Sequence, residues 1–230
     1  MNHAHGHGSS HGDTPTDLEQ MFTQTFWDER YASSTRVWSG QPNRRLVEEL
    51  EALPVTGAGV AVDVGCGEGA DAVWLGRQGW RTIGIDVSQV AVDRATAHAA
   101  DAGLAEQVSF ERADVYAGDP VPGPADLVTS CFMHTPPESF DRIYAAIADA
   151  VAPGGTLVVL AHHPDDATTG LRNPELNALL IGPDQVLAVL EAHAAAWDVA
   201  VAEGRTRSQK LPEGGEVIVT DTVVRAVRRA

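Results

Sequence analysis

Apolar runs of strand length alternate along the chain with segments in which apolar residues recur every three or four positions. The strand-like runs are GVAVDV (59–64), RTIGIDV (81–87), QVSFERADV (107–115), ADLVTSCF (125–132) and TLVVLAH (156–162). The segments after the first, second and fourth of these read as helices, at 69–79, 89–103 and 136–155. Strands that alternate with helices predict an α/β fold with a doubly wound parallel sheet covered on both faces.

The two ends of the chain show other patterns. Residues 1–16 are rich in Gly, Ser and His without periodicity, which predicts a disordered His-rich tail; its four histidines form either a loose metal-binding tract or a solvated tail. Residues 17–54 read as two helices, broken at STRVWSGQPN, with Asn43 as the cap of the second. After an irregular stretch at 163–182 and a helix at 183–194, residues 197–205 and 215–229 read as two strands.

Composition narrows the class of ligand. A chain of 230 residues predicts one domain, and a formal charge of −16, from 32 acidic and 16 basic residues, repels phosphate backbones and anionic membranes. We therefore expect a small-molecule partner, with no nucleic acid and no membrane, and a cytoplasmic location. The two cysteines do not form a disulfide framework, and the sequence leaves the oligomeric state open.

Three aspartates are expected at the carboxyl ends of successive strands, around a turn with glycines at 65, 67 and 69. These are Asp63, Asp86 and Asp114. A dinucleotide fingerprint is G-x-G-x-x-G, and an acid beside it is unfavourable for a pyrophosphate but favourable for a cation. Asp86 suits ribose hydroxyls and Asp114 an adenine amino group, so the pattern predicts S-adenosylmethionine (SAM), a nucleoside with positive charge and no phosphate. Each aspartate alone is also a common turn former, and Asp63 is a candidate to hold the loop backbone.

Four motifs carry a family resemblance. VDVGCGEG (62–69), GIDVS (84–88), ERADV (111–115) and VAPGGTLVV (151–159) resemble class I SAM-dependent methyltransferases over roughly residues 55–165. The resemblance implies a seven-stranded, mostly parallel Rossmann-like sheet with the last strand antiparallel. Together with the three aspartates and the two aromatic residues of the next paragraph, it implies a set of cofactor-binding residues. They are Tyr31, Trp38, Asp63, Gly65, Cys66, Gly67, Asp86, Val87, Asp114, Val115 and Ser130.

The segment FWDERYASSTRVWSGQPNRRLVEEL looks like the leader of small methyltransferases of the thiopurine and tellurite-resistance type. That resemblance implies a helical lid over the cofactor, with Tyr31 and Trp38 in contact with SAM, where an aromatic face favours a sulfonium. Core packing is the alternative for aromatic residues at helical spacing.

Methyl transfer needs a base only when the acceptor atom carries a proton. His134, just past the fourth strand, is the candidate base, and His162 and His163 follow the fifth strand. Cys131 with these histidines lacks the tight ligand spacing of a metal site, so no metal is expected.

The sequence thus predicts a SAM-dependent methyltransferase for a small-molecule O, N, S or metalloid acceptor. Its single domain, 17–230, would comprise a lid (17–54), a SAM-binding core (55–165) and an acceptor-side segment with a C-terminal hairpin (166–230). Two alternatives remain at this point: a non-catalytic protein that senses SAM or metal, and an NAD-dependent oxidoreductase. The acceptor itself is not encoded in any motif.

Overall fold

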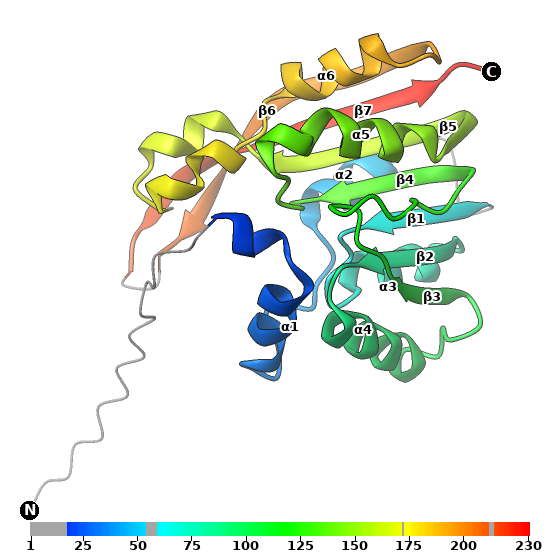
Figure 1. Ribbon diagram of the computed structural model, residues 1–230, viewed down its shortest axis with the longest axis horizontal. Helices are drawn as coiled ribbons and strands as arrows, with labels where there is room; N and C mark the ends of the chain where they lie inside the picture. The colour runs from blue at the N-terminus through cyan, green and yellow to red at the C-terminus, as the bar shows by residue number, and fades with distance from the viewer. Residues whose placement is uncertain (1–17, 54–58, 172, 212–213) are drawn as a thin grey trace, which may run out of the picture.

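The protein is built around one seven-stranded sheet (Figure 1). A computed structural model describes residues 18–53, 59–171, 173–211 and 214–230. The strand order is β3-β2-β1-β4-β5-β7-β6. Every neighbouring pair is parallel except those that involve β7, which runs antiparallel to both β5 and β6. The strands are β1 (Val60–Val64), β2 (Arg81–Asp86), β3 (Val108–Arg112), β4 (Ala125–Cys131), β5 (Val151–His162), β6 (Trp197–Lys210) and β7 (Glu216–Arg228).

The strand order confirms the expected sheet and locates its switch point. From β1 the chain adds β2 and β3 on one side, and then returns to place β4 and β5 on the other side. In open α/β sheets, ligands bind where the order reverses, outside the carboxyl ends of the strands. The reversal here lies between β1 and β4.

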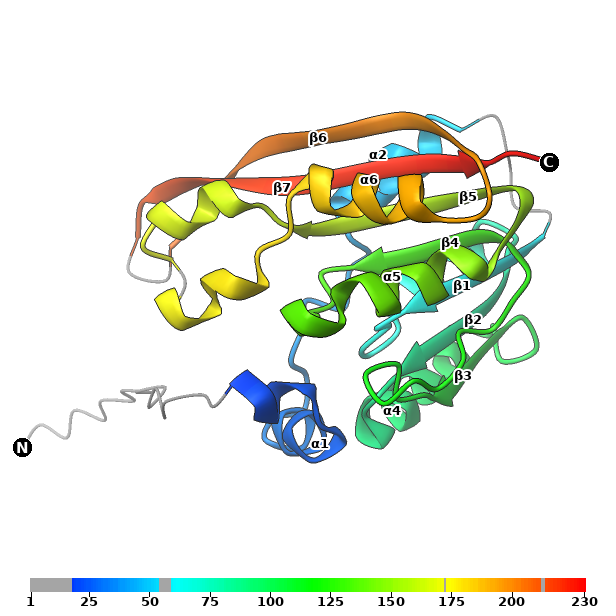
Figure 2. The same ribbon diagram turned by 45° about the horizontal axis from the view of Figure 1, so that its top comes forward.

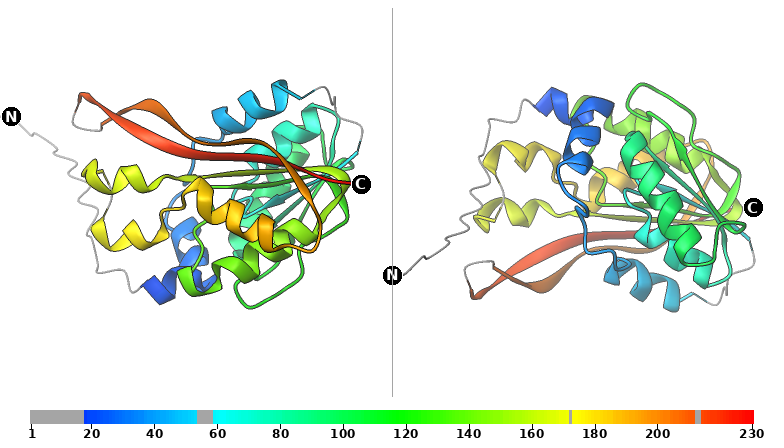
Figure 3. Two further views of the ribbon diagram at one scale, coloured as in Figure 1. Left: turned by 90° about the horizontal axis from the view of Figure 1, so that it is seen from above. Right: turned by 90° about the horizontal axis from the view of Figure 1, so that it is seen from below.

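Helices cover both faces of the sheet. On one face lie α2 (Arg44–Glu51), α3 (Ala70–Arg77) and α4 (Gln89–Asp101), and on the other lie α5 (Phe140–Asp149) and α6 (Pro183–Ala192) (Figure 3). The side-chain oxygens of Asn43 and Ser88 cap α2 and α4, and the Asn43 cap is as the sequence predicts. None of the helices in the described part of the chain is long and apolar enough to cross a bilayer.

The short elements gather beyond the carboxyl ends of the strands (Figures 1 and 2). They are η1 (Leu18–Phe22), α1 (Gln24–Ala32), η2 (Pro137–Ser139), η3 (Pro164–Thr168) and η4 (Pro174–Leu179). They surround the end of the sheet where the switch point predicts a ligand.

The two-residue alternation of the strands divides the core into two layers. Val62 and Val159 pack with α5 and α6, whereas Leu160 and Val223 pack with Leu46 of α2 on the opposite face. Odd-numbered positions of β1 and even-numbered positions at the end of β5 therefore face α2 and α3. Asp63 and His162 share that face.

Four sequence expectations need correction. The first predicted helix is two elements, η1 and α1. β3 ends at Arg112, so Asp114 lies two residues beyond the strand. The helix expected to reach Gly155 ends at Asp149, because the backbone of Ala150 and Val151 already pairs with Ala125 of β4. The first hairpin strand, β6, continues five residues past its predicted end to Lys210, whereas β7 lies within its predicted range. The His-rich tail, residues 1–16, lies outside the described residues.

Helix α2 is tied to the hairpin by a buried carboxylate. Glu49 is 2% exposed and forms ion pairs with Arg205 of β6 and, at 3.1 Å, with Arg225 of β7. A buried charge that keeps its partners is tolerated, but removal of one partner leaves the others uncompensated.

We expect Glu49→Ala to lower the free energy of unfolding by about 3 kcal/mol, because it removes the carboxylate that pairs with the partly buried Arg225 and leaves Arg205 with Glu203 alone. Urea denaturation measures the change. Glu51→Ala, on the exposed side of the same helix, is the matched control and should cost less than about 0.5 kcal/mol. Equal effects of the two substitutions would contradict the role of Glu49.

Candidate functional site

A cavity of about 1100 Å³ opens at the carboxyl ends of the central strands. One wall is the glycine loop (residues 65–69) between β1 and α3, and a second is residues 38–45 before and within α2. The third wall comes from β6 and β7, through residues 206–209 and Asp221. The cavity thus occupies the switch point and is closed by parts of the chain that are far apart in sequence.

The glycine loop needs its glycines for both conformation and space. Gly65 and Gly67 have φ values of 74° and 53°, in the left-handed region that glycine adopts without strain. A Cβ on Gly67 would lie 2.9 Å from the Tyr31 hydroxyl, and one on Gly65 would lie 3.0 Å from Met133. The loop therefore bends sharply while other segments press directly against its backbone.

Two carboxylates lie next to this loop, one buried (Asp63) and one half-buried (Asp71). Asp63, at 2% exposure, accepts a hydrogen bond from Thr129 Oγ1 at 2.7 Å. Asp71, in the first turn of α3, accepts the Asn43 backbone N–H at 2.5 Å and the Cys131 thiol. Burial raises the pKa of both carboxyl groups, and repulsion from Asp71 raises the pKa of Asp63 further. Neither forms an ion pair within the described chain, so a positively charged ligand beside them would favour their ionised forms.

A third carboxylate, Asp86, lies at the end of β2. Its Oδ2 accepts the Gly67 N–H and its Oδ1 accepts the Ser88 N–H, both at 2.9 Å. Burial raises the pKa of Asp86 to about 6, although these two hydrogen bonds favour the ionised form. Each carboxylate oxygen has a second lone pair, so Asp86 shapes the loop and can still accept donors from a ligand.

The amino-terminal segment (residues 18–53) covers the glycine loop. Tyr31 is buried, and its hydroxyl accepts the Trp38 indole N–H at 3.0 Å, directly over Gly67. Glu68 accepts the backbone N–H groups of residues 37 and 38 and pairs with Arg94 of α4 at 3.0 Å. A residue of the loop itself therefore holds the covering segment in place.

Aromatic rings form another part of the cavity wall. The rings of Trp27 and His134 are nearly parallel, with centroids 6.4 Å apart, and His134 lies 6.1 Å from His162. Phe132 packs against His162 at 4.6 Å and has a φ of 57°, a left-handed conformation that is strained for a non-glycine residue. Strain of this kind is found at functional sites.

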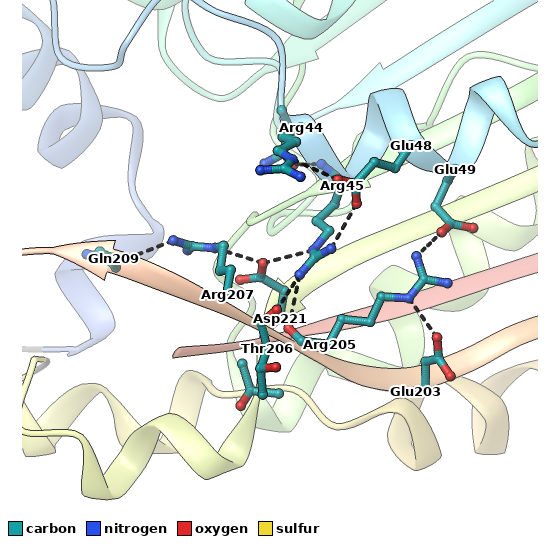
Figure 4. Close-up of polar contacts among 12 residues, drawn as sticks. Arg44, Arg45, Glu48, Glu49, Glu203, Arg205, Thr206, Arg207, Gln209 and Asp221 are labelled. Atoms are coloured by element: carbon teal, nitrogen blue, oxygen red, sulfur yellow. Dashed lines mark hydrogen bonds and ion pairs between the residues drawn. The ribbon is translucent and has the colours of Figure 1, made fainter. Parts of the chain in front are cut away.

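The third wall is held by one carboxylate between two arginines (Figure 4). Asp221 Oδ2 accepts Arg207 Nε at 2.8 Å and lies 3.5 Å from Arg45 Nε. Arg45 also donates to the Thr206 carbonyl at 2.7 Å and pairs with Glu48 at 2.8 Å. The start of α2 is thereby fastened to the hairpin beside the cavity.

The cavity gathers most of the predicted cofactor residues. Ser130 is buried outside its wall, and Asp114 is also outside it, because its carboxylate accepts the Ala117 N–H in a turn. The predicted residues in the wall are Tyr31, Trp38, Asp63, Gly65, Cys66, Gly67, Asp86, Val87 and Val115. No ligand contact tests these assignments, and they stay predictions.

Sequence reasoning missed Asp71 and the group formed by Arg45, Arg207 and Asp221. Asp71 reads as an ordinary first-turn helix acid, although its place four residues after Gly67 is a usable signal. The other three come from three separate elements and share no local spacing. Among the described residues no three His, Cys, Asp or Glu side chains gather as metal ligands.

Comparison with known proteins identifies the fold's family. Residues 61–155 match the model of a methyltransferase domain. The chain is 30% identical over 175 residues to a 2-heptyl-1-hydroxyquinolin-4(1H)-one methyltransferase of Mycobacteroides abscessus, with 71% of this chain and 76% of that protein covered.

Other relatives carry the same chemistry on different acceptors. A thiopurine S-methyltransferase of Pseudomonas entomophila is 28% identical over 224 residues, covering 88% of this chain and 97% of that protein. A ribosomal RNA small subunit methyltransferase C of Alcanivorax borkumensis is 33% identical over 122 residues, with 51% of this chain but 36% of that protein covered. A solved structure that concerns conversion of a disulfide into a thioacetal in echinomycin biosynthesis has a TM-score of 0.67 at 19% identity, covering 90% and 91% of the two chains.

These findings agree with the geometry of the site. The carboxylates beside the glycine loop have no ion-pair partner in the described chain and suit the cationic cofactor that the family uses. Of the three interpretations of the sequence, the methyltransferase is therefore kept, and the nicotinamide-dependent oxidoreductase and the non-catalytic sensor are set aside. The chain belongs to the class I SAM-dependent methyltransferases and is an enzyme of that family.

Proposed function

We propose that this enzyme transfers the methyl group of SAM to a small, planar acceptor at an oxygen, nitrogen or sulfur atom, with a metalloid centre as the remaining option. The observation that carries the proposal is one continuous cavity of about 1100 Å³ whose lining combines the carboxylates of Asp63, Asp71 and Asp86 with the rings of Trp27, Phe132 and His134. Pockets for a single drug-sized ligand measure about 300–1000 Å³, so this one has room for a cofactor and a small acceptor together.

The cofactor would occupy the carboxylate end. Its cationic methionine part would lie near Asp63 and Asp71, its ribose at Asp86, and its adenine between Val87 and Val115. Asp114, expected to take the adenine amino group, lies outside the cavity wall whereas Val115 lies in it, although Ala117 engages only Oδ1 of Asp114 and Oδ2 could still accept that group. We infer that Val115 contributes more to the adenine site than Asp114 does.

The acceptor would lie against Phe132, Trp27 and His134. Two relatives with wide coverage are named for acceptors built on nitrogen heterocycles, a quinolinone and a thiopurine. Flat rings of that kind stack on aromatic side chains. The net charge of −16 disfavours a nucleic-acid acceptor, and the ribosomal RNA methyltransferase shares only about a third of its length with this chain.

The cell compartment follows from the thiols. Cys66 and Cys131 are both free, and burial raises the pKa of each thiol well above its ordinary value. Protonated, unpaired thiols at a site of function fit a reducing compartment, and we propose the cytoplasm.

The reaction would be an in-line displacement. The acceptor atom forms a bond to the methyl carbon, the carbon–sulfur bond breaks, and its electron pair neutralises the sulfonium. Alignment and exclusion of water supply most of the rate, because the methyl group is already activated. An acceptor that still carries its proton needs a base, and His134 is the proposed base.

We expect SAM binding to release protons and to strengthen as pH rises. The pKa values of Asp63 and Asp71 are raised in the free protein, and a bound cation favours the ionised forms and lowers them. Calorimetry in buffers of different ionisation enthalpy at about pH 6, about 7 and about 8 measures both effects. Asp71→Asn should weaken SAM about 10- to 100-fold and reduce the proton release.

Asp93→Asn is the matched control for that experiment, since Asp93 is exposed on α4 and its carboxylate meets Gln89. It should change neither affinity nor proton release. Binding of SAM that is independent of pH, or binding of NADH instead, would overturn the cation site.

We expect Trp38→Ala to weaken SAM binding about tenfold, because the ring that covers the cofactor site and its hydrogen bond to Tyr31 are both lost. Trp38→Phe keeps an aromatic face and should retain most of the affinity. A folded Trp38→Ala variant that binds SAM like the wild type removes the lid role of this segment.

Release of S-adenosylhomocysteine with thiols, phenols, quinones, nitrogen heterocycles and metalloid oxyanions tests the proposed function and its base together. We expect His134→Ala to slow methylation of acceptors that are protonated at the assay pH about 100-fold, and to spare acceptors that are already ionised. His134→Phe keeps a ring for packing without a basic nitrogen and should behave like the alanine variant. Full turnover of His134→Ala with every acceptor would exclude His134 as the base.

A further inference from the structure

The side of the cavity formed by β5 and β7 holds a polar group that the proposed reaction does not yet use. Asp221 Oδ2 is bound by Arg207, and Arg45 lies near the same oxygen. Its Oδ1 is buried and has no hydrogen-bond partner in the part of the chain that the structure describes. A buried carboxylate oxygen without a donor is costly, and native proteins usually supply one.

The nearest candidate donor follows from the strand register. His162, the last residue of β5, is paired directly with Asp221 of β7 in the antiparallel ladder. Residues directly opposite in such a pair project to the same face, with Cβ atoms about 4.5–5.5 Å apart. Both residues line the cavity, so the imidazole of His162 lies within reach of the Asp221 carboxylate.

His162 also borders the proposed base. Its ring centroid is 6.1 Å from that of His134, and Phe132 packs against it at 4.6 Å. The Tyr116 hydroxyl donates to the backbone carbonyl of His134 at 2.9 Å and so fixes the loop that carries this ring. Side-chain rotations that bring the two rings about 1 Å closer would place their nitrogens within hydrogen-bond distance.

Resting on the proposed function, we propose that Asp221 acts through His162 to set the tautomer of His134. Asp221 Oδ1 accepts one ring N–H of His162, and the other nitrogen of His162 then accepts a ring N–H of His134. The nitrogen of His134 that faces the acceptor is left without a proton and is basic. In this series of hydrogen bonds Asp221 and His162 are positioning residues, whereas His134 is the group that touches the acceptor.

The chemical step balances with groups already present. The acceptor proton moves to His134 as the acceptor atom bonds to the methyl carbon and the sulfonium sulfur takes the electron pair. His134 becomes an imidazolium, stabilised through His162 by the carboxylate of Asp221, and later returns its proton to water. Arg45 from α2 and Arg207 from β6 are the charged groups that face Asp221, and they hold its Oδ2 while Oδ1 serves His162.

The test combines nitrogen NMR of labelled, full-length protein saturated with S-adenosylhomocysteine and turnover with two kinds of acceptor. In the wild type we expect one dominant tautomer for His134 and for His162. Asp221→Asn should change both, since an amide can donate where the carboxylate only accepted. The substitution should slow the methylation of protonated acceptors about 10- to 100-fold and change the rate with ionised acceptors by less than about twofold.

His162→Gln removes the histidine between Asp221 and His134 but keeps the Asp221 carboxylate as the partner of Arg45 and Arg207. It therefore tests the proposal even if Asp221→Asn disturbs folding. It should alter the His134 tautomer and reproduce the selective loss on protonated acceptors. Asp198→Asn is the matched control, because Asp198 is a carboxylate of the same hairpin paired with Arg229 at 2.6 Å outside the cavity.

Unaltered His134 tautomers in both variants, or equal losses on protonated and ionised acceptors, overturn the proposal. The NMR arm needs no turnover, so it decides the proposal even where no acceptor is methylated. Such a lack of methylation would count against the proposed function instead.

Discussion

Two carboxyl groups without a basic partner in the described part of the chain, whose pKa values are raised, are the constraint on which this site depends. Asp63 and Asp71 lie beside the bend after β1, and neither has a basic partner within the described chain. Burial of an isolated carboxylate is costly, and the protein limits that cost through raised pKa values and through hydrogen bonds from Thr129, Asn43 and Cys131. In the proposed binding mode SAM supplies a positive charge beside these two carboxyl groups, and their ionised forms become favourable when it binds.

The sheet determines where this charge can be held. β1 is flanked by β2 and β4, so their carboxyl ends open onto one site at the reversal of strand order. The glycine loop then allows the covering segment to approach closely, since Tyr31 and Trp38 occupy the space that a Cβ of residue 67 would need. Glu68, in the same loop, binds that segment and Arg94. Cofactor site and cover are therefore parts of one contact surface.

The sequence predicted the features that depend on local patterns. Asp63 and Asp86 were placed correctly because each follows an alternating apolar run that does form a strand, whereas β3 stops early and leaves Asp114 in a turn. Asp71 was missed because a first-turn aspartate is common on any helix, and only the fold shows that it faces Asp63 across a buried space. The acceptor side could not be predicted at all. Arg45, Arg207 and Asp221 are separated by 14 to 176 residues, and only tertiary packing brings them together.

Helix α2 connects the two ends of the cavity. The backbone N–H of Asn43, its cap residue, donates to Asp71 at the cofactor end, and Arg45, two residues later, pairs with Asp221 at the acceptor end. Glu49, one turn further on, is buried against Arg205 and Arg225 of the hairpin. A short helix held at three points is rigid, so its first turn fixes the separation between Asp71 and Asp221 on the two sides of the cavity. In-line methyl transfer needs such a fixed separation, because the reacting atoms must align without the help of a covalent intermediate.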